Sequence, residues 1–109
     1  QDFLHKEKLD FNPYVIDVKS RSITRDGKSI DLTIKEFDLT LFLFRHLGQL
    51  LSRGHILESI WGRSPEMNTR TVDTHASRIR SKLDMSPASG FKLSSVYFYG
   101  YRLERVVAA

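Results

Sequence analysis

The 109-residue chain contains no cysteine. It therefore has neither a disulfide framework nor a thiolate metal site, which is compatible with a cytosolic location. Its four histidines, His5, His46, His55 and His75, include no close pair of the kind that binds a metal ion. We therefore expect no metal site and no other cofactor.

Long apolar runs are also lacking. No segment approaches the roughly 18 apolar residues of a membrane span. The first ten residues, QDFLHKEKLD, are polar and charged, unlike a signal peptide. Internal repeats and low-complexity stretches are absent as well. We expect a cytoplasmic protein and, because the first residue is Gln rather than Met, a processed chain or a domain cut from a longer protein.

The composition fits one globular domain with a single core, since 40% of the residues are hydrophobic. The formal net charge is +4 and the pI is about 9.6. A basic balance of this size agrees with nucleic-acid binding and also with a merely basic surface.

Two regions have the composition of β-structure. Between Phe11 and Leu32 the β-rich runs YVIDV, RSITR and KSIDL are separated by turn residues, among them Asp26-Gly27, a hairpin signal. This predicts an antiparallel sheet of three or four strands, with Asn12-Pro13 either opening a strand or lying between two. The segment KLSSVYFYGYRLERV predicts a C-terminal β-hairpin.

Two helices are predicted between these regions. Thr33 and Glu36 have the spacing of a capping box, and the apolar helix that follows should end near Gly48. Its expected apolar stripe is Phe37, Leu41, Phe44 and Leu47, widened by Leu39, Phe42 and Leu43. Ser52 can cap a second helix that ends at Gly62. The expected apolar side of that helix is Leu57, Ile60 and Trp61.

A third helix is predicted over TRTVDTHASRIRSKL, Thr69 to Leu83, with Asn68 or Thr69 as its cap. On a helical wheel, where successive residues are about 100° apart, four apolar residues fall within roughly 40° of Val72 or at it and form a stripe. This stripe comprises Val72, Ala76, Ile79 and Leu83. The opposite side carries Arg70, Thr71, Thr74, Ser77, Arg78 and Ser81. Four basic residues and one acid give the segment a net charge of +3. Short polar residues between arginines suit a helix that enters the major groove, and an ordinary surface helix is the alternative.

Helix, turn, a basic third helix and a hairpin form the plan of a winged helix-turn-helix. Four blocks, LTIKEFDL, LLSRGHILESIWG, RTVDTHASRIRSKL and VYFYGYRL, resemble in order and spacing the DNA-binding output domain of OmpR/PhoB-type response regulators. The resemblance implies an α+β winged helix over residues 10–105, with tails at 1–9 and 106–109.

The resemblance implies that the third helix enters the major groove of double-stranded DNA. The matching positions are Arg70, Thr71, Asp73, Thr74, His75, Ser77, Arg78 and Arg80. An arginine fork can bond a guanine edge, which makes Arg78 the first choice for base reading, and Thr74 can offer its methyl group to thymine. Asp73 either accepts a hydrogen bond from cytosine or orients Arg70 or Ser77.

Several residues have other expected roles. Arg80, His75 and Lys82 lie nearer the core, where they bind phosphates or pair with acids. Trp61 is expected to bury its ring and to offer its indole N–H to a phosphate. Many relatives carry a basic residue in place of Ser77, which implies fewer phosphate contacts and a weaker salt dependence of binding here.

Two segments differ from the family or lie in loops. The loop between the second and third helices contacts RNA polymerase in several members, which would make Arg63 and Glu66 contact residues. In the hairpin, Tyr97-Phe98-Tyr99-Gly100 replaces the usual Gly-x-Gly turn, so the turn has another shape or its tip is shifted toward Gly100. Tyr97 and Tyr99 either bond phosphates or form cross-strand pairs.

The resemblance also implies partners: a second copy bound to direct-repeat half-sites of DNA, and an N-terminal receiver domain that a sensor kinase phosphorylates. The alternative is a winged helix that binds an acidic protein. An enzyme is not expected, because Asp73, His75 and Ser77 diverge by about 200° at each step of two residues and cannot form a catalytic relay.

Overall fold

A computed structural model describes residues 8–62, 68–96 and 99–106. Its first part is an antiparallel sheet of four strands in sequential order, β1 (Lys8–Phe11), β2 (Tyr14–Asp17), β3 (Ser22–Arg25) and β4 (Lys28–Ile30). The structure confirms the predicted antiparallel sheet, with four strands rather than three. Strand β1 begins two residues before position 10, and Asn12-Pro13 lies between β1 and β2.

The turn between β3 and β4 is the one predicted from Asp26-Gly27. Both residues have positive φ, 52° and 81°, as a type I′ hairpin turn requires. Arg25 and Lys28 are paired on either side of it. The turn therefore fixes the register of these strands from two residues alone.

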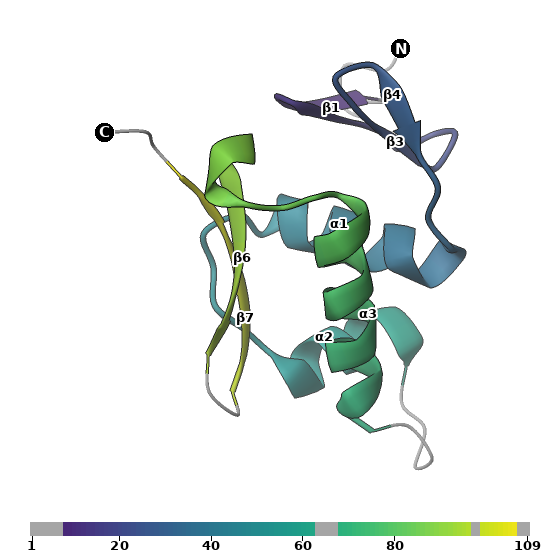
Figure 1. The fold of residues 1–109 in the computed structure, drawn as a ribbon. Helices are drawn as coiled ribbons and strands as arrows, with labels where there is room; N and C mark the ends of the chain where they lie inside the picture. Colours follow the sequence, from purple (N-terminus) through teal and green to yellow (C-terminus); the bar gives the residue numbers. More distant parts are fainter. Residues whose placement is uncertain (1–7, 63–67, 97–98, 107–109) are drawn as a thin grey trace.

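Helix α1 (Ile34–Arg45) crosses below this sheet (Figure 1). Its capping box is formed: the Glu36 N–H donates to Thr33 Oγ1 at 3.2 Å, and the Thr33 N–H donates to Glu36 Oε1 at 3.0 Å. The buried side differs in part from the expected stripe. It comprises Glu36, Phe37, Leu39, Thr40, Leu43 and Phe44, whereas Leu41, Phe42 and Leu47 are half-buried.

Helix α2 (Arg53–Trp61) begins where predicted, because Ser52 Oγ accepts the His55 N–H at 3.0 Å. It ends at Gly62, whose φ is 82°. The prediction of its apolar side missed Ile56, which is fully buried, while Leu57, Ile60 and Trp61 are half-buried. The three expected residues do pack against the core, and Ile56 adds a fourth contact that the prediction lacked.

Helix α3 (Arg70–Lys82) has the predicted buried stripe. Val72, Ala76, Ile79 and Leu83 are at most 2% exposed. Asn68 rather than Thr69 supplies the side chain at the start of the helix, through a 2.9 Å bond from the Arg70 N–H to its Oδ1.

The C-terminal part contains a short 3-10 helix, η1 (Pro87–Ser89), and the predicted hairpin of β6 (Phe91–Val96) and β7 (Gly100–Arg105). A short strand, β5 (Leu51–Ser52), pairs with β7 and was not predicted. Gly100 is needed here because a Cβ atom would lie 1.8 Å from the Leu51 carbonyl oxygen. Close approach of β5, rather than turn geometry, therefore demands glycine at this position.

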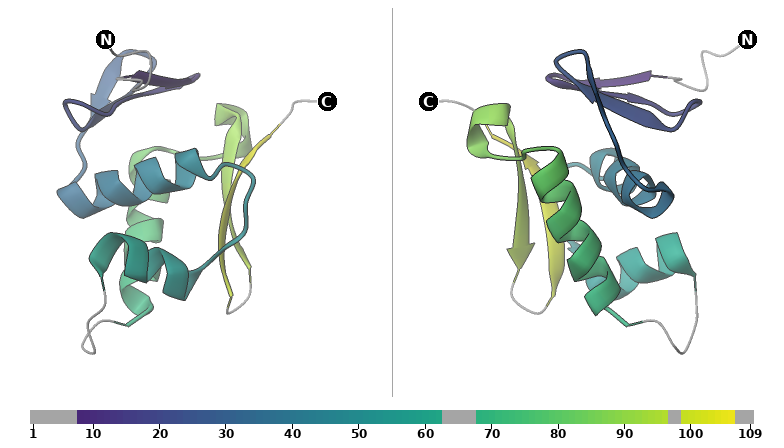
Figure 2. Two further views of the ribbon diagram at one scale, coloured as in Figure 1. Left: turned by 180° about the vertical axis from the view of Figure 1, so that it is seen from behind. Right: turned by 45° about the vertical axis from the view of Figure 1, so that its right-hand side comes forward.

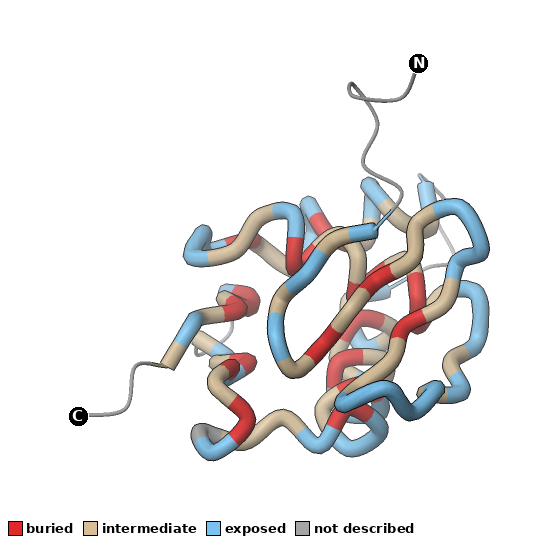
Figure 3. The backbone as a smooth tube through the Cα atoms, turned by 90° about the horizontal axis from the view of Figure 1, so that it is seen from above, coloured by how far each residue is buried: buried red, intermediate tan, exposed pale blue. Residues whose placement is uncertain are grey.

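An aromatic cluster joins the sheet, α1 and the hairpin. The Phe44 ring lies 4.7 Å from Phe11, 5.9 Å from Tyr14 and 5.3 Å from Phe91, measured between centroids. Seen from above the sheet, buried positions alternate along β2, β3 has one buried residue, and further buried positions lie in the helices below (Figure 3). The architecture is the predicted α+β winged helix-turn-helix. No helix within the described ranges combines the length and apolar content of a membrane span.

Candidate nucleic-acid interface

The side of α3 opposite its buried stripe is open. Arg70, Thr74, Ser77 and Arg78 are exposed and Thr71 is half-buried. Helix α3 and the β6–β7 hairpin lie side by side in each ribbon view (Figures 1 and 2). The exposed face therefore combines two arginines with short hydroxyl side chains, and a β-hairpin stands next to it.

Asp73 has partners that sequence analysis did not foresee. Its carboxylate forms an ion pair with Arg53 at the start of α2 and accepts the Tyr101 hydroxyl of β7 at 2.6 Å. The expected bonds to Arg70 or Ser77 do not form, since the carboxylate is held by residues of two other elements. Burial, together with the hydrogen bond and charge of Asp73, raises the pKa of Tyr101 to about 12.

Two cations of α3 also bond to other parts of the protein. Arg80 donates to the Leu93 carbonyl of β6 at 2.7 Å, which neither expected role for Arg80 included. Lys82 pairs with an acid, the second of its expected roles: its Nζ lies 2.6 Å from Glu36 Oε1. Burial opposes ionisation of Glu36, but the bonds from Lys82 and the Thr33 backbone, with nearby positive charge, hold the pKa of its carboxyl below the usual 4.5.

His75 and Trp61 pack against each other. Their rings meet edge to face with centroids 4.9 Å apart, and His75 Nδ1 lies 2.9 Å from the Thr71 carbonyl oxygen. Because a carbonyl only accepts, Nδ1 carries the proton and Nε2 is the ring nitrogen left for another partner. The Asp73 carboxylate is bonded to Arg53 and Tyr101, and His75 Nδ1 to the Thr71 carbonyl. Asp73, His75 and Ser77 are therefore not joined in a catalytic relay.

The remaining predicted site residues lie in or near loops. Tyr99 is 51% exposed beside the first residue of β7. Gly100 pairs with Val96 and so belongs to the ladder of the hairpin, while the predicted change at its tip falls on residues outside the described ones. The predictions for Tyr97, Arg63 and Glu66 fall outside the described residues.

Sequence reasoning missed two residues of this region, Arg53 and Tyr101. Arg53 belongs to the block LLSRGHILESIWG, which resembles the family, but nothing in its local pattern pointed to α3. Tyr101 and Leu103 lie two residues apart on one face of β7, which marks that face as inward without revealing that the Tyr101 hydroxyl reaches Asp73.

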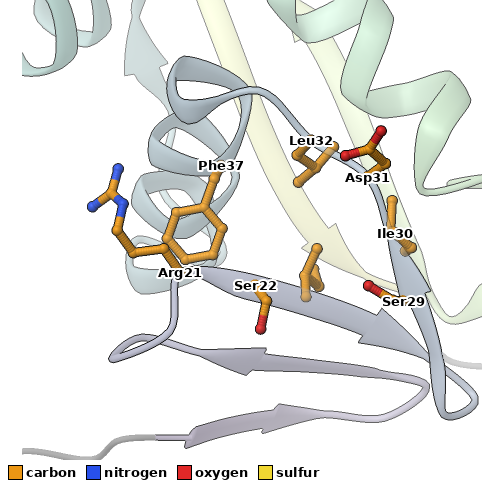
Figure 4. Close-up of a pocket in the computed structure, with 8 residues that line it drawn as sticks. Arg21, Ser22, Ser29, Ile30, Asp31, Leu32 and Phe37 are labelled. Carbon is orange, nitrogen blue, oxygen red and sulfur yellow. The ribbon is translucent and has the colours of Figure 1, made fainter.

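A separate pocket of about 470 Å³ lies between the N-terminal sheet and the start of α1 (Figure 4). Its described lining residues all fall between positions 21 and 37. Arg21 at its rim pairs with Asp38 and stands over the Phe37 ring, 5.2 Å from its centroid. The pocket therefore belongs to the sheet and α1 rather than to the exposed face of α3.

Comparison with known proteins agrees with this geometry. A family model described as "Transcriptional regulatory protein, C terminal" matches residues 27–103. The sensory transduction protein RegX3 of Mycobacterium tuberculosis is 38% identical over 96 residues, which cover 88% of this chain and 42% of RegX3. The chain thus spans less than half the length of this relative.

Solved structures have the same fold. The DNA-binding domain of Klebsiella pneumoniae RstA, determined in complex with the RstA box, is 27% identical with a TM-score of 0.78, covering 91% of this chain and 98% of that one. DrrB, an OmpR/PhoB homolog of Thermotoga maritima, is 30% identical with a TM-score of 0.78, covering 91% of this chain and 45% of DrrB. The family is one of transcription regulators, not of enzymes. The chain belongs to this family, the C-terminal domains of OmpR/PhoB-type transcriptional regulators.

Proposed function

We propose that this chain binds double-stranded DNA at specific sequences and serves as the output domain of a two-component response regulator. The observation that carries the proposal is the division of α3 into a fully buried stripe and an exposed face with Arg70, Thr74, Ser77 and Arg78. The RstA domain, which has the same fold, was solved with its DNA box.

The exposed side chains suit different parts of a duplex. Arg78 can bond a guanine edge with two parallel hydrogen bonds, and Thr74 can place its methyl group on thymine. Arg70 and Thr71, in the first turn, are assigned to phosphates or sugars, which orient the helix in the groove. His75 and Trp61, packed together on one flank, are assigned to the DNA backbone, with the Trp61 indole N–H as the donor to a phosphate.

The hairpin and the side chains that hold it complete the site. Tyr99 is exposed in the hairpin and is assigned, with Tyr97, to the sugar-phosphate backbone. Arg80 donates to the Leu93 carbonyl from one guanidinium nitrogen, so its other N–H groups can donate to a phosphate.

Membership of the family supports a proposal about partners. We propose that two copies bind direct-repeat half-sites, that a receiver domain phosphorylated by a sensor kinase controls them in the bacterial cytoplasm, and that Arg63 and Glu66 contact RNA polymerase. No catalytic role is proposed. RegX3, of which this chain matches 42%, is named a sensory transduction protein, and a second relative, SaeR of Staphylococcus epidermidis, is named a response regulator.

Fluorescence anisotropy on pooled random duplexes at two salt concentrations tests the proposal. DNA binding predicts that affinity falls as salt rises, because each phosphate contact releases counterions. Selection from the same pool should enrich particular sequences. Failure to bind any duplex near physiological salt would sink the proposal and favour the alternative, a winged helix that binds an acidic protein.

A further inference from the structure

Three elements meet at the first turn of α3, and Asp73 joins them. The Arg53 guanidinium at the start of α2 pairs with one carboxylate oxygen of Asp73. The Tyr101 hydroxyl of β7 donates to the other oxygen at 2.6 Å. The Arg53 backbone N–H also donates to the Tyr99 carbonyl at 2.9 Å, so α2 is bonded directly to the hairpin. Asp73 thus closes a ring of contacts among α2, α3 and β7.

A second contact joins α3 to the hairpin. Arg80 lies two helical turns after Asp73 on the same side of α3 and donates to the Leu93 carbonyl of β6 at 2.7 Å. The two contacts hold different strands of the hairpin at different heights along the helix. The hairpin is therefore fixed against both sliding and rotation relative to α3.

The charge of Asp73 needs an explanation. Its side chain is 40% exposed on the helix assigned to DNA, where a carboxylate repels phosphates. Each oxygen already has a partner within the protein, which orients the carboxylate toward Arg53 and Tyr101. An acid at this position favours DNA binding only if its bonds to Arg53 and Tyr101 strengthen recognition by more free energy than its repulsion of phosphates removes.

We propose that Asp73 is a positioning residue for sequence-specific binding, which sets the hairpin and the start of α2 relative to α3 without contacting a base. The inference rests on the proposed function. A specific site must match α3 and the hairpin simultaneously, in one relative geometry. Random DNA is bound mainly by electrostatic attraction to phosphates, which does not require one fixed geometry of α3 and the hairpin.

Asp73→Asn separates positioning from charge. The amide has nearly the same shape, but it loses the ion pair with Arg53 and raises the formal net charge by one from +4. If Asp73 acts only through its charge, the variant should bind all DNA more tightly. If it positions the hairpin, the variant should bind a library-selected duplex about tenfold more weakly, while binding to random duplexes is unchanged or tighter.

Tyr101→Phe tests the same contact without changing charge, and Tyr14→Phe is its matched control. Tyr14 is also buried, and its hydroxyl donates to the Leu83 carbonyl at 2.7 Å, just past the other end of α3. Each variant loses one buried tyrosine hydroxyl bond to α3 or its cap. We expect similar losses of thermal stability for both, and a lower ratio of selected to random affinity only for Tyr101→Phe.

The measurements are anisotropy titrations of the 109-residue chain and its variants on the selected duplex and on the random pool. Equal tightening on both DNAs by Asp73→Asn, with wild-type behaviour of Tyr101→Phe, would overturn the inference and leave Asp73 as a simple charge. An equal fall of the ratio in Tyr14→Phe would overturn it too, because general destabilisation would then explain the effect. If the unmodified chain enriches no duplex, the proposed function itself fails, and the inference fails with it.

Discussion

The contact of Glu36 with Lys82 allows a quantitative test of how α3 is held. Glu36 is 1% exposed, and its Oε1 accepts both the Thr33 N–H of the capping box and the Lys82 ammonium. Lys82→Met keeps a side chain of similar length but removes the charge. It leaves a buried carboxylate with a single backbone donor.

The expected loss of stability is about 2–3 kcal/mol at pH 7. Breaking a buried ion pair costs about 3–5 kcal/mol, because the remaining charge is buried without compensation. The Lys82 side chain is 39% exposed and the Thr33 N–H bond stays, so we place the loss at or below the lower end of that range. A domain of this size has a free energy of unfolding of about 5–15 kcal/mol, so the loss is readily measured.

The loss should depend on pH with a definite sign. The folded-state pKa of Glu36 lies below 4.5, so the stability from its ionised form is present above about pH 4.5 and is lost as pH falls through the folded pKa. In Lys82→Met, burial without the lysine raises the pKa of the carboxyl, so the variant regains stability as it takes up a proton. The difference between the two proteins should therefore shrink toward acid pH.

Urea denaturation of both proteins at pH 7, 5.5 and 4 measures this difference. Asp84→Asn is the control, because it breaks the pair of Arg25 with an acid that is 79% exposed, and exposed pairs contribute less than about 1 kcal/mol. A loss for Lys82→Met no larger than that of the control, or one of equal size at pH 4 and pH 7, would refute the reasoning.

Three other predictions follow from the same structure. Arg78→Ala should weaken binding to a selected duplex by about 1–3 kcal/mol and relax selectivity at one base pair, whereas an equal loss on random DNA in the same anisotropy assay would make this arginine a phosphate contact. Gly100→Ala should cost about 3 kcal/mol or more in denaturant unfolding, because its Cβ would meet the Leu51 carbonyl oxygen at 1.8 Å. Gly54→Ala, with open space around the new methyl group, should be neutral or slightly stabilising, and an equal loss would contradict the steric argument. Since the folded-state pKa of Tyr101 is about 12, stability from its neutral form is complete below pH 10 and lost between about pH 10 and 12. An ultraviolet absorbance titration should show a late step that Tyr101→Phe removes, and an unchanged curve would argue against it.

Local signals predicted most of the fold. The Asp26-Gly27 turn, the Thr33 capping box and the buried stripe of α3 depend on residues within one turn or a few helical turns, so short patterns suffice to find them. Strand β5 has only two residues and exists because Leu51 meets β7, which no local pattern records.

The candidate site was predictable only in part, for the same reason. Periodicity separates the exposed side of α3 from its buried side, and so finds Arg78 and Thr74. It does not reveal partners that lie far away in the sequence. Asp73 and Tyr101 are 28 residues apart, and Glu36 and Lys82 are 46 apart. These contacts give Asp73 two partners within the protein, Arg53 and Tyr101, that its local sequence does not reveal.

The central claim is that the exposed face of α3 reads DNA sequence, and its most direct test is the ratio of affinities for a library-selected duplex and a composition-matched scrambled duplex at physiological salt. We expect a ratio on the order of 10³ for the unmodified chain. Joint replacement of Thr74 and Arg78 by alanine should bring the ratio close to one while binding to scrambled DNA largely persists. A ratio near one for the unmodified chain, or a high ratio that survives the double replacement, would contradict the claim.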